Sequence, residues 1–381
     1  MKFHIHQTHH TIADFQGIRA YIESILENGA TGIHIFPELF LCGYPLHDIC
    51  LQKSFIEKHQ SFLLELDKLF QSNQKTDQLF LLGGIKYELT EEGLPLKLLN
   101  VIYQASPGMA LKPIYSKQLL PNYDIFDEMK YFSSGEGPEI LEYKGVNIGL
   151  LICEDMWSSN FHKKDPVNEL KLLCDKKNVS LDAIVNLSAS PFVFAKNEKR
   201  LERAKFISNL FKAPFLYVNR VGGEDEILFD GQSFVISGDQ VELEMARFKQ
   251  DQATYELNPK SATYKPTSKG AGANTWEQLF TARIATSTPK LVELSQINCE
   301  EIIEALCFGF QEYARKNGFN RFTIALSGGM DSALVLTLIK LSLKEGQYLE
   351  AIYMPSIHSS PLSHELSLQL CENLGIPFKS L

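Results

Sequence analysis

Short apolar runs of strand length recur along the first two thirds of the chain, and amphipathic segments separate them. Such runs, flanked by turn-forming residues, predict strands at 33–36, 79–82, 101–103, 146–152, 183–185 and 215–218. Residues 15–27 and 55–70 place apolar side chains three and four positions apart, as helices with one buried face do. Hairpin-like pairs are expected at 98–115 and 140–152. The pattern predicts a layered α/β or α+β domain in which strands and helices do not simply alternate.

The composition changes at residues 258–290. This segment holds three prolines, a glycine-rich run at 268–273 and few large aliphatic side chains, which is typical of a linker. We therefore expect a first domain over 1–257, a linker over 258–290 and a second domain over 291–381.

The second domain has the order of elements that opens a parallel nucleotide-binding sheet. A helical pattern at 299–316 is followed by a buried strand at 322–326, a glycine-rich turn, a helix at 331–343 and a strand at 349–354. A turn that enters a further strand is expected at 375–378. Because the segment is short for a doubly wound α/β domain, we expect it to be only the beginning of one.

Composition narrows the class of partner. The chain has 381 residues, of which 44% are hydrophobic, enough for two domains with cores of their own. A formal net charge of -9 disfavours nucleic acid and anionic membranes as partners. The sequence has no apolar run long enough to span a membrane and no apolar signal-peptide core at its start. We therefore expect a cytoplasmic protein that acts on small molecules.

The cysteines point to chemistry at one position only. There are seven, an odd number, and none forms a Cys-x-x-Cys pair, so neither a disulfide framework nor a zinc site is expected. Cys153 differs from the rest because it follows the strand at 146–152 and precedes two acids and a tryptophan. That position suits a nucleophile at a strand exit, although a buried cysteine that ends a core strand would look the same.

Two further side chains stand in comparable positions. Glu38 follows the strand at 33–36 and is flanked by apolar residues, where burial would favour a role in proton transfer. Lys117 would pair with Glu38 and place positive charge near a developing oxyanion. The alternatives are an acid at a strand end that faces water and a surface lysine.

Taken together, these three residues resemble the Glu-Lys-Cys triad of the nitrilase, or carbon-nitrogen hydrolase, superfamily. The segments that extend the resemblance are 36–38, 42–45, 117–132, 153–155, 186–191 and 217–223, so it covers about residues 1–257. It implies a four-layer αββα sandwich in which Cys153 attacks an amide carbonyl, Glu38 is the general base and Lys117 stabilises the oxyanion. A base is needed because a free thiol is mostly protonated at neutral pH.

A second candidate site is the sequence Ser-Gly-Gly-Met-Asp-Ser at 327–332. Two glycines between a strand and a helix let backbone N–H groups close around an anion at the helix N-terminus; a plain glycine-containing turn is the alternative. The sequence resembles the pyrophosphate-binding signature of the ATP pyrophosphatase (PP-loop) family. That resemblance implies an ATP site, with Mg²⁺ required, formed by Ser327, Gly328, Gly329, Asp331 and Ser332. No residue is assigned as a metal ligand.

An amide-hydrolysing domain followed by an adenylating one resembles the glutamine-dependent NAD synthetase family. The resemblance implies that glutamine is hydrolysed for ammonia, which amidates nicotinic acid adenine dinucleotide to NAD with ATP and Mg²⁺, and that the glutaminase domain needs no cofactor. It implies a homo-oligomer, and a glutamine pocket formed by Tyr123, Glu154, Trp157, Ser190 and Lys196. Relatives often carry arginine at position 196; lysine keeps the charge but loses the bidentate fork. Relatives also continue well beyond the part that matches 357–381, so we expect this chain to lack the end of the synthetase domain.

Two other functions remain open. One is a stand-alone carbon-nitrogen hydrolase that acts on another small amide, with the last segment a relict. The other is a non-catalytic scaffold subunit, which would have no physical need of Glu38, Lys117 and Cys153 together. A glutaminase differs from a general amidase because it should discriminate against amides that lack the α-amino and α-carboxyl groups.

Overall fold

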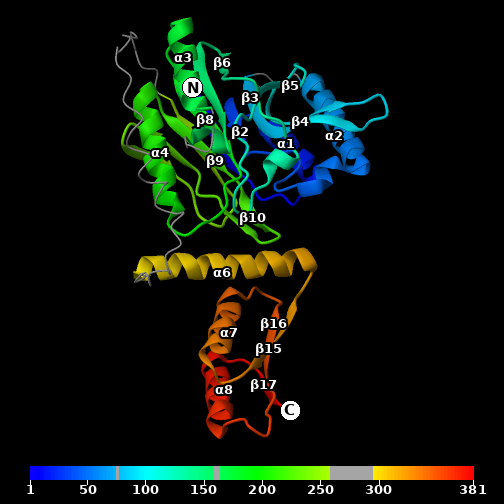
Figure 1. The fold of residues 1–381 in the computed structure, drawn as a ribbon, viewed down its shortest axis with the longest axis vertical. Coiled ribbons are helices and arrows are strands. Elements are labelled where there is room, and N and C mark those ends of the chain that lie inside the picture. Colours follow the sequence, from blue (N-terminus) through cyan, green and yellow to red (C-terminus); the bar gives the residue numbers. More distant parts are fainter. Residues whose placement is uncertain (74–76, 158–163, 258–294) are drawn as a thin grey trace. The chain divides into compact units, whose positions relative to one another are not determined.

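A computed structural model gives the structure of residues 1–73, 77–157, 164–257 and 295–381. The chain forms two compact units, Met1–Lys290 and Leu291–Leu381 (Figure 1). The linker expected at 258–290 lies outside the described residues. Within the described ranges, no helix is both long enough and apolar enough to cross a membrane.

The first unit is built on two six-stranded sheets. The first sheet has the order β14-β1-β2-β3-β4-β5, in which β1, β2 and β3 run parallel and the other neighbours pair antiparallel. Its strands are β1 (Lys2–Gln7), β2 (Gly32–Ile35), β3 (Gln78–Leu89), β4 (Pro95–Ala105), β5 (Lys112–Ser116) and β14 (Asp251–Glu256).

The second sheet repeats this plan. Its order is β13-β12-β9-β8-β7-β6, and β7, β8 and β9 run parallel. Its strands are β6 (Ile140–Tyr143), β7 (Val146–Ile152), β8 (Ala183–Ser188), β9 (Phe215–Asn219), β12 (Phe234–Ser237) and β13 (Gln240–Glu244). A separate antiparallel hairpin joins β10 (Val221–Glu224) to β11 (Ile227–Asp230).

Three hydrophobic clusters arrange the first unit in four layers. The central cluster joins the two sheets, with Ile35 of the first sheet and Ile152 of the second among its members. A second cluster packs the first sheet against α1 (Phe15–Asn28) and α2 (Lys53–Ser72). A third packs the second sheet against α3 (Pro166–Lys177) and α4 (Lys196–Phe211). Figure 1 shows the two helix pairs on opposite sides of the sheets, so the expected αββα sandwich is confirmed.

Local sequence explains where these helices begin and end. The Asp14 carboxylate accepts the Gly17 N–H at 3.0 Å and caps the start of α1, and Gly29 ends the helix in the left-handed conformation. Buried Ile18, Ile22 and Ile25 follow each other at intervals of four and three residues, so one face of α1 meets the sheet.

The parallel strands set the place of the site. The segments that follow β2 and β7 carry Glu38 and Cys153, and those that follow β8 and β9 carry Ser190 and Arg220. In parallel sheets, reactive groups gather at the carboxyl ends of the strands. Among the described connections lie the short 3-10 helices η1 (His47–Leu51), η2 (Glu128–Lys130) and η3 (Cys153–Met156).

The second unit is a three-stranded parallel sheet with the order β15-β16-β17. Its elements are α6 (Gln296–Asn317), β15 (Arg321–Leu326), α7 (Met330–Ser342), β16 (Tyr348–Tyr353), α8 (Pro361–Leu374) and β17 (Phe378–Ser380). One apolar cluster joins the sheet to α7 and α8. The strand, glycine turn, helix and strand predicted from the sequence are all present, and the predicted turn leads into β17. The strand at 322–326 was expected to be buried, but of the β15 residues only Leu326 is buried in the structure.

The sequence pattern missed some elements of the first unit. The strand β1 carries His4 and His6 among its apolar residues, which hides its buried face although His6 is fully buried. The helix α4 buries Arg200 and Arg203. Buried charged side chains are rare because their desolvation must be offset by partners that the sequence does not reveal.

Candidate active site

Glu38 lies in a tight turn directly after β2. The turn sits against Gly83 of β3, where an added Cβ atom would lie 2.3 Å from the carbonyl oxygen of Pro37. Glu38 is only 2% exposed. Its Oε1 accepts the side-chain amide of Asn100 at 2.7 Å, and its Oε2 accepts the Ala189 N–H at 2.9 Å. The alternative of an acid that faces water is therefore wrong.

Lys117 leaves the end of β5 and points into the same buried space. Its side chain is fully buried, and Nζ donates to Glu38 Oε1 at 2.7 Å, so the pairing expected from the sequence is present and the surface-lysine alternative is wrong. Burial lowers the pKa of Lys117, but the charges of Glu128 and Glu38 raise it more and leave it well above its ordinary value. The ammonium group therefore stays charged.

Glu128 of η2 is a second carboxylate on the same ammonium. Both of its oxygens accept from Lys117 Nζ at 2.8 Å, and Oε1 also accepts the Tyr44 hydroxyl at 2.9 Å. Burial raises the pKa of Glu128 to about 7, against the opposing effect of Lys117. From the sequence, Glu128 is part of a segment that matches the family and nothing more, because an acid in a polar loop carries no local signal of burial.

Cys153 is placed at the exit of β7, where the backbone bends into η3. Its φ of 44° is in the left-handed region, which costs a non-glycine residue about 1–3 kcal/mol and is found at functional sites. A thiol on a sharp turn after a strand is presented to a substrate much as in a nucleophile elbow. Burial raises the pKa of the Cys153 thiol well above its usual value, Glu38 raises it further, and Lys117 opposes both. The resting group is thus a thiol that needs a base.

Two predicted pocket residues are in direct contact. The Tyr123 hydroxyl donates to both carboxylate oxygens of Glu154 at 3.0 Å. Glu154 follows Cys153 directly and is 8% exposed. The structure therefore places an acid with a hydroxyl partner beside the thiol.

The other predicted pocket residues lie on the second sheet and its helices. Lys196 begins α4 and is half-buried; burial and the charge of Arg200 lower its pKa to about 8, while Cys153 and Glu154 raise it. Ser190 follows β8 and is buried, and its Oγ accepts from Arg200 Nη2 at 3.2 Å. Trp157 packs at the edge of the cluster beneath α3 and α4.

Arg200, which was not predicted from the sequence, holds the loop after β8. Arg200 is fully buried and pairs with Asp230 at 2.6 Å. Its Nη2 also donates to the carbonyl oxygens of Ser190 and Pro191. Because Ala189 in this loop donates its N–H to Glu38, the arginine supports the position of the acid indirectly.

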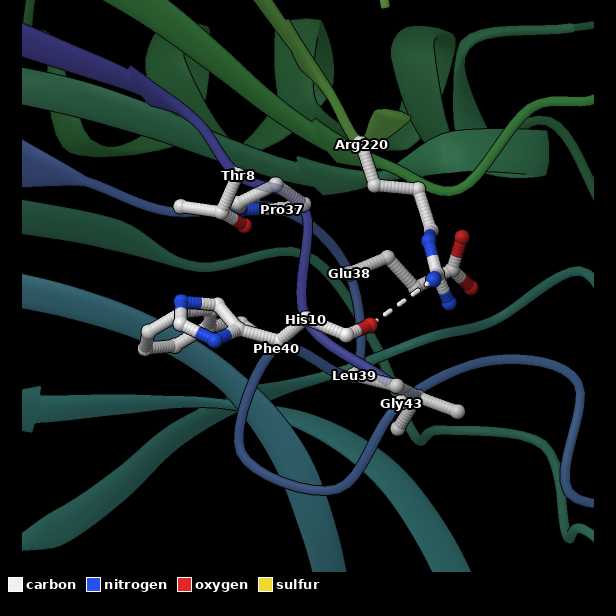
Figure 2. Close-up of a pocket in the computed structure, with 8 residues that line it drawn as sticks. All are labelled: Thr8, His10, Pro37, Glu38, Leu39, Phe40, Gly43 and Arg220. Carbon is white, nitrogen blue, oxygen red and sulfur yellow. Dashed lines mark hydrogen bonds between the residues drawn. The ribbon is translucent and has the colours of Figure 1, made fainter. Parts of the chain in front are cut away.

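A small pocket is lined by the turn that carries Glu38. Figure 2 shows its lining residues: Thr8, His10, Pro37, Glu38, Leu39, Phe40, Gly43 and Arg220. Arg220 Nη2 donates to the carbonyl oxygen of His10 at 3.1 Å and to Glu224 at 3.2 Å, and Nη1 donates to the carbonyl oxygen of Tyr44. Arg220 thus hydrogen-bonds to the segment after β1 and to the segment that follows the turn.

The five predicted phosphate-loop residues lie together in the second unit: Ser327, Gly328 and Gly329 form the turn between β15 and α7, and Asp331 and Ser332 lie in the first turn of α7. The Ser327 hydroxyl accepts the Gly329 N–H at 3.2 Å, and the Ser327 N–H donates to Ser332 Oγ at 3.3 Å. Gly328 has a φ of 75°, and an added Cβ atom would lie 2.6 Å from Ser363 Cα, so a side chain is excluded there.

In the described part of the chain, no group of three or more His, Cys, Asp or Glu side chains is placed to hold a metal ion. The side chains of the first unit bring together a nucleophile, an acid that can take a proton, and a cation that contacts two carboxylates.

Two family models match the chain. The model described as carbon-nitrogen hydrolase matches residues 7–255, and the model described as NAD synthase matches residues 302–381.

Curated relatives cover nearly the whole chain. It is 32% identical over 345 residues to the glutamine-dependent NAD(+) synthetase of Synechocystis sp., covering 89% of this chain and 56% of the relative. It is 32% identical over 384 residues to the enzyme of the same name from Aquifex aeolicus, covering 98% of this chain and 64% of the relative. The chain thus spans less than two thirds of the length of these relatives.

Solved structures of proteins with the same name are similar to this chain in fold. The glutamine-dependent NAD+ synthetase from Acinetobacter baumannii, solved in complex with adenosine diphosphate, superposes with a TM-score of 0.77 at 25% identity. The match covers 100% of this chain and 64% of that one. A glutamine-dependent NAD(+) synthetase from Cytophaga hutchinsonii shares the fold with a TM-score of 0.72 at 18% identity, over 100% of this chain and 64% of that one.

Proposed function

The chain belongs to the carbon-nitrogen hydrolase family, and from this we propose that its first unit hydrolyses the side-chain amide of glutamine to glutamate and ammonia. The observation that carries the proposal is the buried pair of Glu38 and Lys117, whose charges act directly on the Cys153 thiol. A base, a cation and a nucleophile in one buried site are the parts that acyl transfer needs.

The proposed reaction has two steps. Glu38 takes the thiol proton, the Cys153 sulfur attacks the amide carbonyl, and the Lys117 ammonium stabilises the oxyanion that forms. The C–N bond then breaks, ammonia leaves with the proton from Glu38, and a thioester remains. In the second step Glu38 takes a proton from water, hydroxide attacks the thioester, and Cys153 recovers its proton as glutamate leaves.

The charges around the thiol support a free amino acid as the substrate. Glu154, with the Tyr123 hydroxyl, is suited to an α-ammonium group, whereas Lys196 and Ser190 are suited to an α-carboxylate. We propose that these four residues and Trp157 bind glutamine. No cofactor is needed for the steps above.

For the second unit we propose ATP binding through Ser327, Gly328, Gly329, Asp331 and Ser332, with Mg²⁺ on the phosphates. In the whole reaction, ammonia would amidate nicotinic acid adenine dinucleotide to NAD at the expense of ATP. The NAD synthase match over 302–381 and the adenosine diphosphate bound by the Acinetobacter baumannii relative support this part.

The arrangement of the chain is also part of the proposal. We propose a glutaminase domain over 1–257, a linker over 258–290 and an ATP-binding domain over 291–381, in a homo-oligomer located in the cytoplasm. Neither nucleic acid nor a membrane is proposed as a partner.

The test is release of ammonia from glutamine, compared with asparagine and a simple aliphatic amide. The blank is Cys153→Ala, and the matched control is Cys299→Ala, which removes an exposed cysteine of α6. We expect release from glutamine alone, lost in the blank and kept in the control. Release from the simple amide would identify a general carbon-nitrogen hydrolase instead, and turnover by Cys153→Ala would overturn the role of the thiol.

A further inference from the structure

The three reacting groups come from two different sheets. Glu38 follows β2 and Lys117 follows β5, both in the first sheet, whereas Cys153 follows β7 in the second. The distance between the thiol and the ammonium therefore depends on how the two sheets are held against each other at this end. A displacement of about 1 Å between reacting groups can cost on the order of 100-fold in rate.

One carboxylate oxygen of Asp155 binds the chain next to Lys117. Oδ1 accepts the N–H groups of Gln118 at 3.0 Å and Leu119 at 2.8 Å. These are the two residues that follow Lys117, so the carboxylate restrains the position of their backbone.

The other oxygen of Asp155 binds the chain next to Cys153 and a strand of the opposite sheet. Oδ2 accepts the Ile152 N–H at 3.1 Å, directly before the nucleophile, and the Tyr115 hydroxyl of β5 at 2.8 Å. The whole side chain is fully buried. A single carboxylate thus takes four donors, three from the first sheet's Lys117 segment and one from the strand that carries the thiol.

We propose that Asp155 is a positioning residue that holds the Cys153 turn in register with Lys117 across the two sheets. The inference rests on the proposed amide hydrolysis for its activity assay, but not for its measurement of thiol reactivity. Asp155 touches no reacting atom; it acts through the backbone on either side of two residues that do.

Only an ionised carboxylate matches this set of donors. An asparagine would accept with one oxygen and turn an NH₂ group toward one pair of donors, so either the Lys117 side or the Cys153 side would open. The titratable neighbours that bear on the carboxylate are Tyr115, which donates to it, and Lys117, whose charge stabilises its ionised form. Burial raises the pKa of Asp155 to about 6. Lowering the pH through this range should therefore protonate Asp155 and weaken its hydrogen bonds to the two segments.

The experiment compares Asp155→Asn with Asp182→Asn. Asp182 is a matched control because its carboxylate also accepts a backbone N–H, that of Asn147 at 2.8 Å, in the second sheet but without a bond to the Lys117 segment. Three quantities are measured for each protein: kcat and KM for glutamine, the rate at which iodoacetamide alkylates Cys153 between about pH 5 and 9, and the melting temperature.

For Asp155→Asn we expect kcat per folded molecule to fall by about 100-fold with KM nearly unchanged. The pH profile of Cys153 alkylation should shift from that of the wild type, because the thiol has moved relative to Lys117. The wild type should lose activity below about pH 6, and Asp182→Asn should match the wild type in kcat and in the alkylation profile.

An unchanged kcat, or a loss explained entirely by unfolded protein, would overturn the proposal. If wild-type protein releases no ammonia from glutamine, the proposed function fails, and the alkylation profile alone decides: identical profiles for wild type and Asp155→Asn would overturn the role of Asp155. If Asp155→Asn does not fold, Tyr115→Phe removes one of the four donors. We then expect a lower kcat at an unchanged KM, and a kcat equal to that of the wild type would count against Asp155.

Discussion

Both carboxylate oxygens of Glu128 accept a hydrogen bond from the Lys117 ammonium, at 2.8 Å each. Because Glu38 accepts from the same ammonium, two buried carboxylates share one positive charge. Burial raises the pKa of Glu128 to about 7, and the charge of Lys117 opposes this shift by favouring the ionised form. Ionised Glu128 offers Lys117 two acceptor oxygens, and Glu38 offers a third.

Replacing Glu128 by Gln should therefore impair the reaction although Glu128 touches no substrate in the proposed mechanism. The amide side chain of this variant would offer Lys117 one acceptor in place of two, and the ammonium would lose its fixed position. We expect kcat to fall by about tenfold or more, with KM changed little. Glu142→Gln, which alters an exposed acid of β6, is the control, and a Glu128→Gln enzyme as fast as this control would show that the second carboxylate is dispensable.

Replacing Glu38 by Gln should be more severe, because the thiol loses its base. The expected loss in kcat is well above tenfold, which corresponds to about 1.4 kcal/mol. Lys117 keeps its pair with Glu128, so the melting temperature should fall only modestly. Steady-state kinetics and thermal unfolding of the same preparation check both statements; a change below tenfold would indicate that Glu38 is merely an acid at a strand end.

Binding of glutamine should weaken at alkaline pH. Burial and the charge of Arg200 lower the pKa of Lys196 to about 8, so Lys196 is charged below this pH and becomes neutral above it. We expect KM for glutamine to rise between about pH 8 and 9.5, with a smaller change in kcat.

The matched variant for this prediction is Lys196→Arg, because an arginine keeps its charge throughout that range. Its KM should stay flat where the wild-type KM rises. If KM for glutamine rises equally with pH in the two proteins, Lys196 does not bind the substrate's α-carboxylate.

The first unit should lose stability in mild acid through a pair of buried histidines. His6 Nε2 and His34 Nδ1 lie 3.0 Å apart, and His34 Nε2 lies 2.9 Å from the carbonyl oxygen of Ala30. If His6 donates to His34 and His34 donates to Ala30, both rings are satisfied as neutral groups. Burial lowers the pKa of His34 to about 4, and burial together with the charges of His34 and His4 lowers the pKa of His6 well below its ordinary value.

The direction in which stability changes with pH follows from proton uptake in the unfolded and folded states. Unfolded histidines take up protons below about pH 6.5, whereas the folded pair stays neutral, so the free energy of unfolding should fall as the pH drops from about 6.5 toward 4. His34 alone accounts for a loss on the order of 3 kcal/mol. Urea unfolding of the first unit across this range measures it. In His34→Gln the slope should be smaller, whereas His358→Gln, which changes an exposed residue of the second unit, should leave the slope as it is.

The local pattern of apolar and polar residues predicted many of the elements of this structure. The strand β7 lies at 146–152, as its apolar run predicts, and α1 and α7 lie within a residue of their predicted bounds. The apolar pattern did not predict β1 and α4, because His6 and Arg200 are polar residues that are buried in the protein. Their burial depends on partners from distant segments, and amphipathic periodicity cannot register such partners.

The sequence by itself determined the order and type of the main elements, the family, and the positions of Glu38, Lys117 and Cys153, since strand periods and motifs are properties of neighbouring residues. The pairing of Lys117 with Glu38 was expected from the sequence, but only the tertiary structure decided which other charged groups meet. Glu128 became a partner of Lys117, and Asp155 became a link between the two sheets, because hydrogen bonding acts over about 3 Å. Groups far apart in sequence reach that distance only when folding brings their segments together.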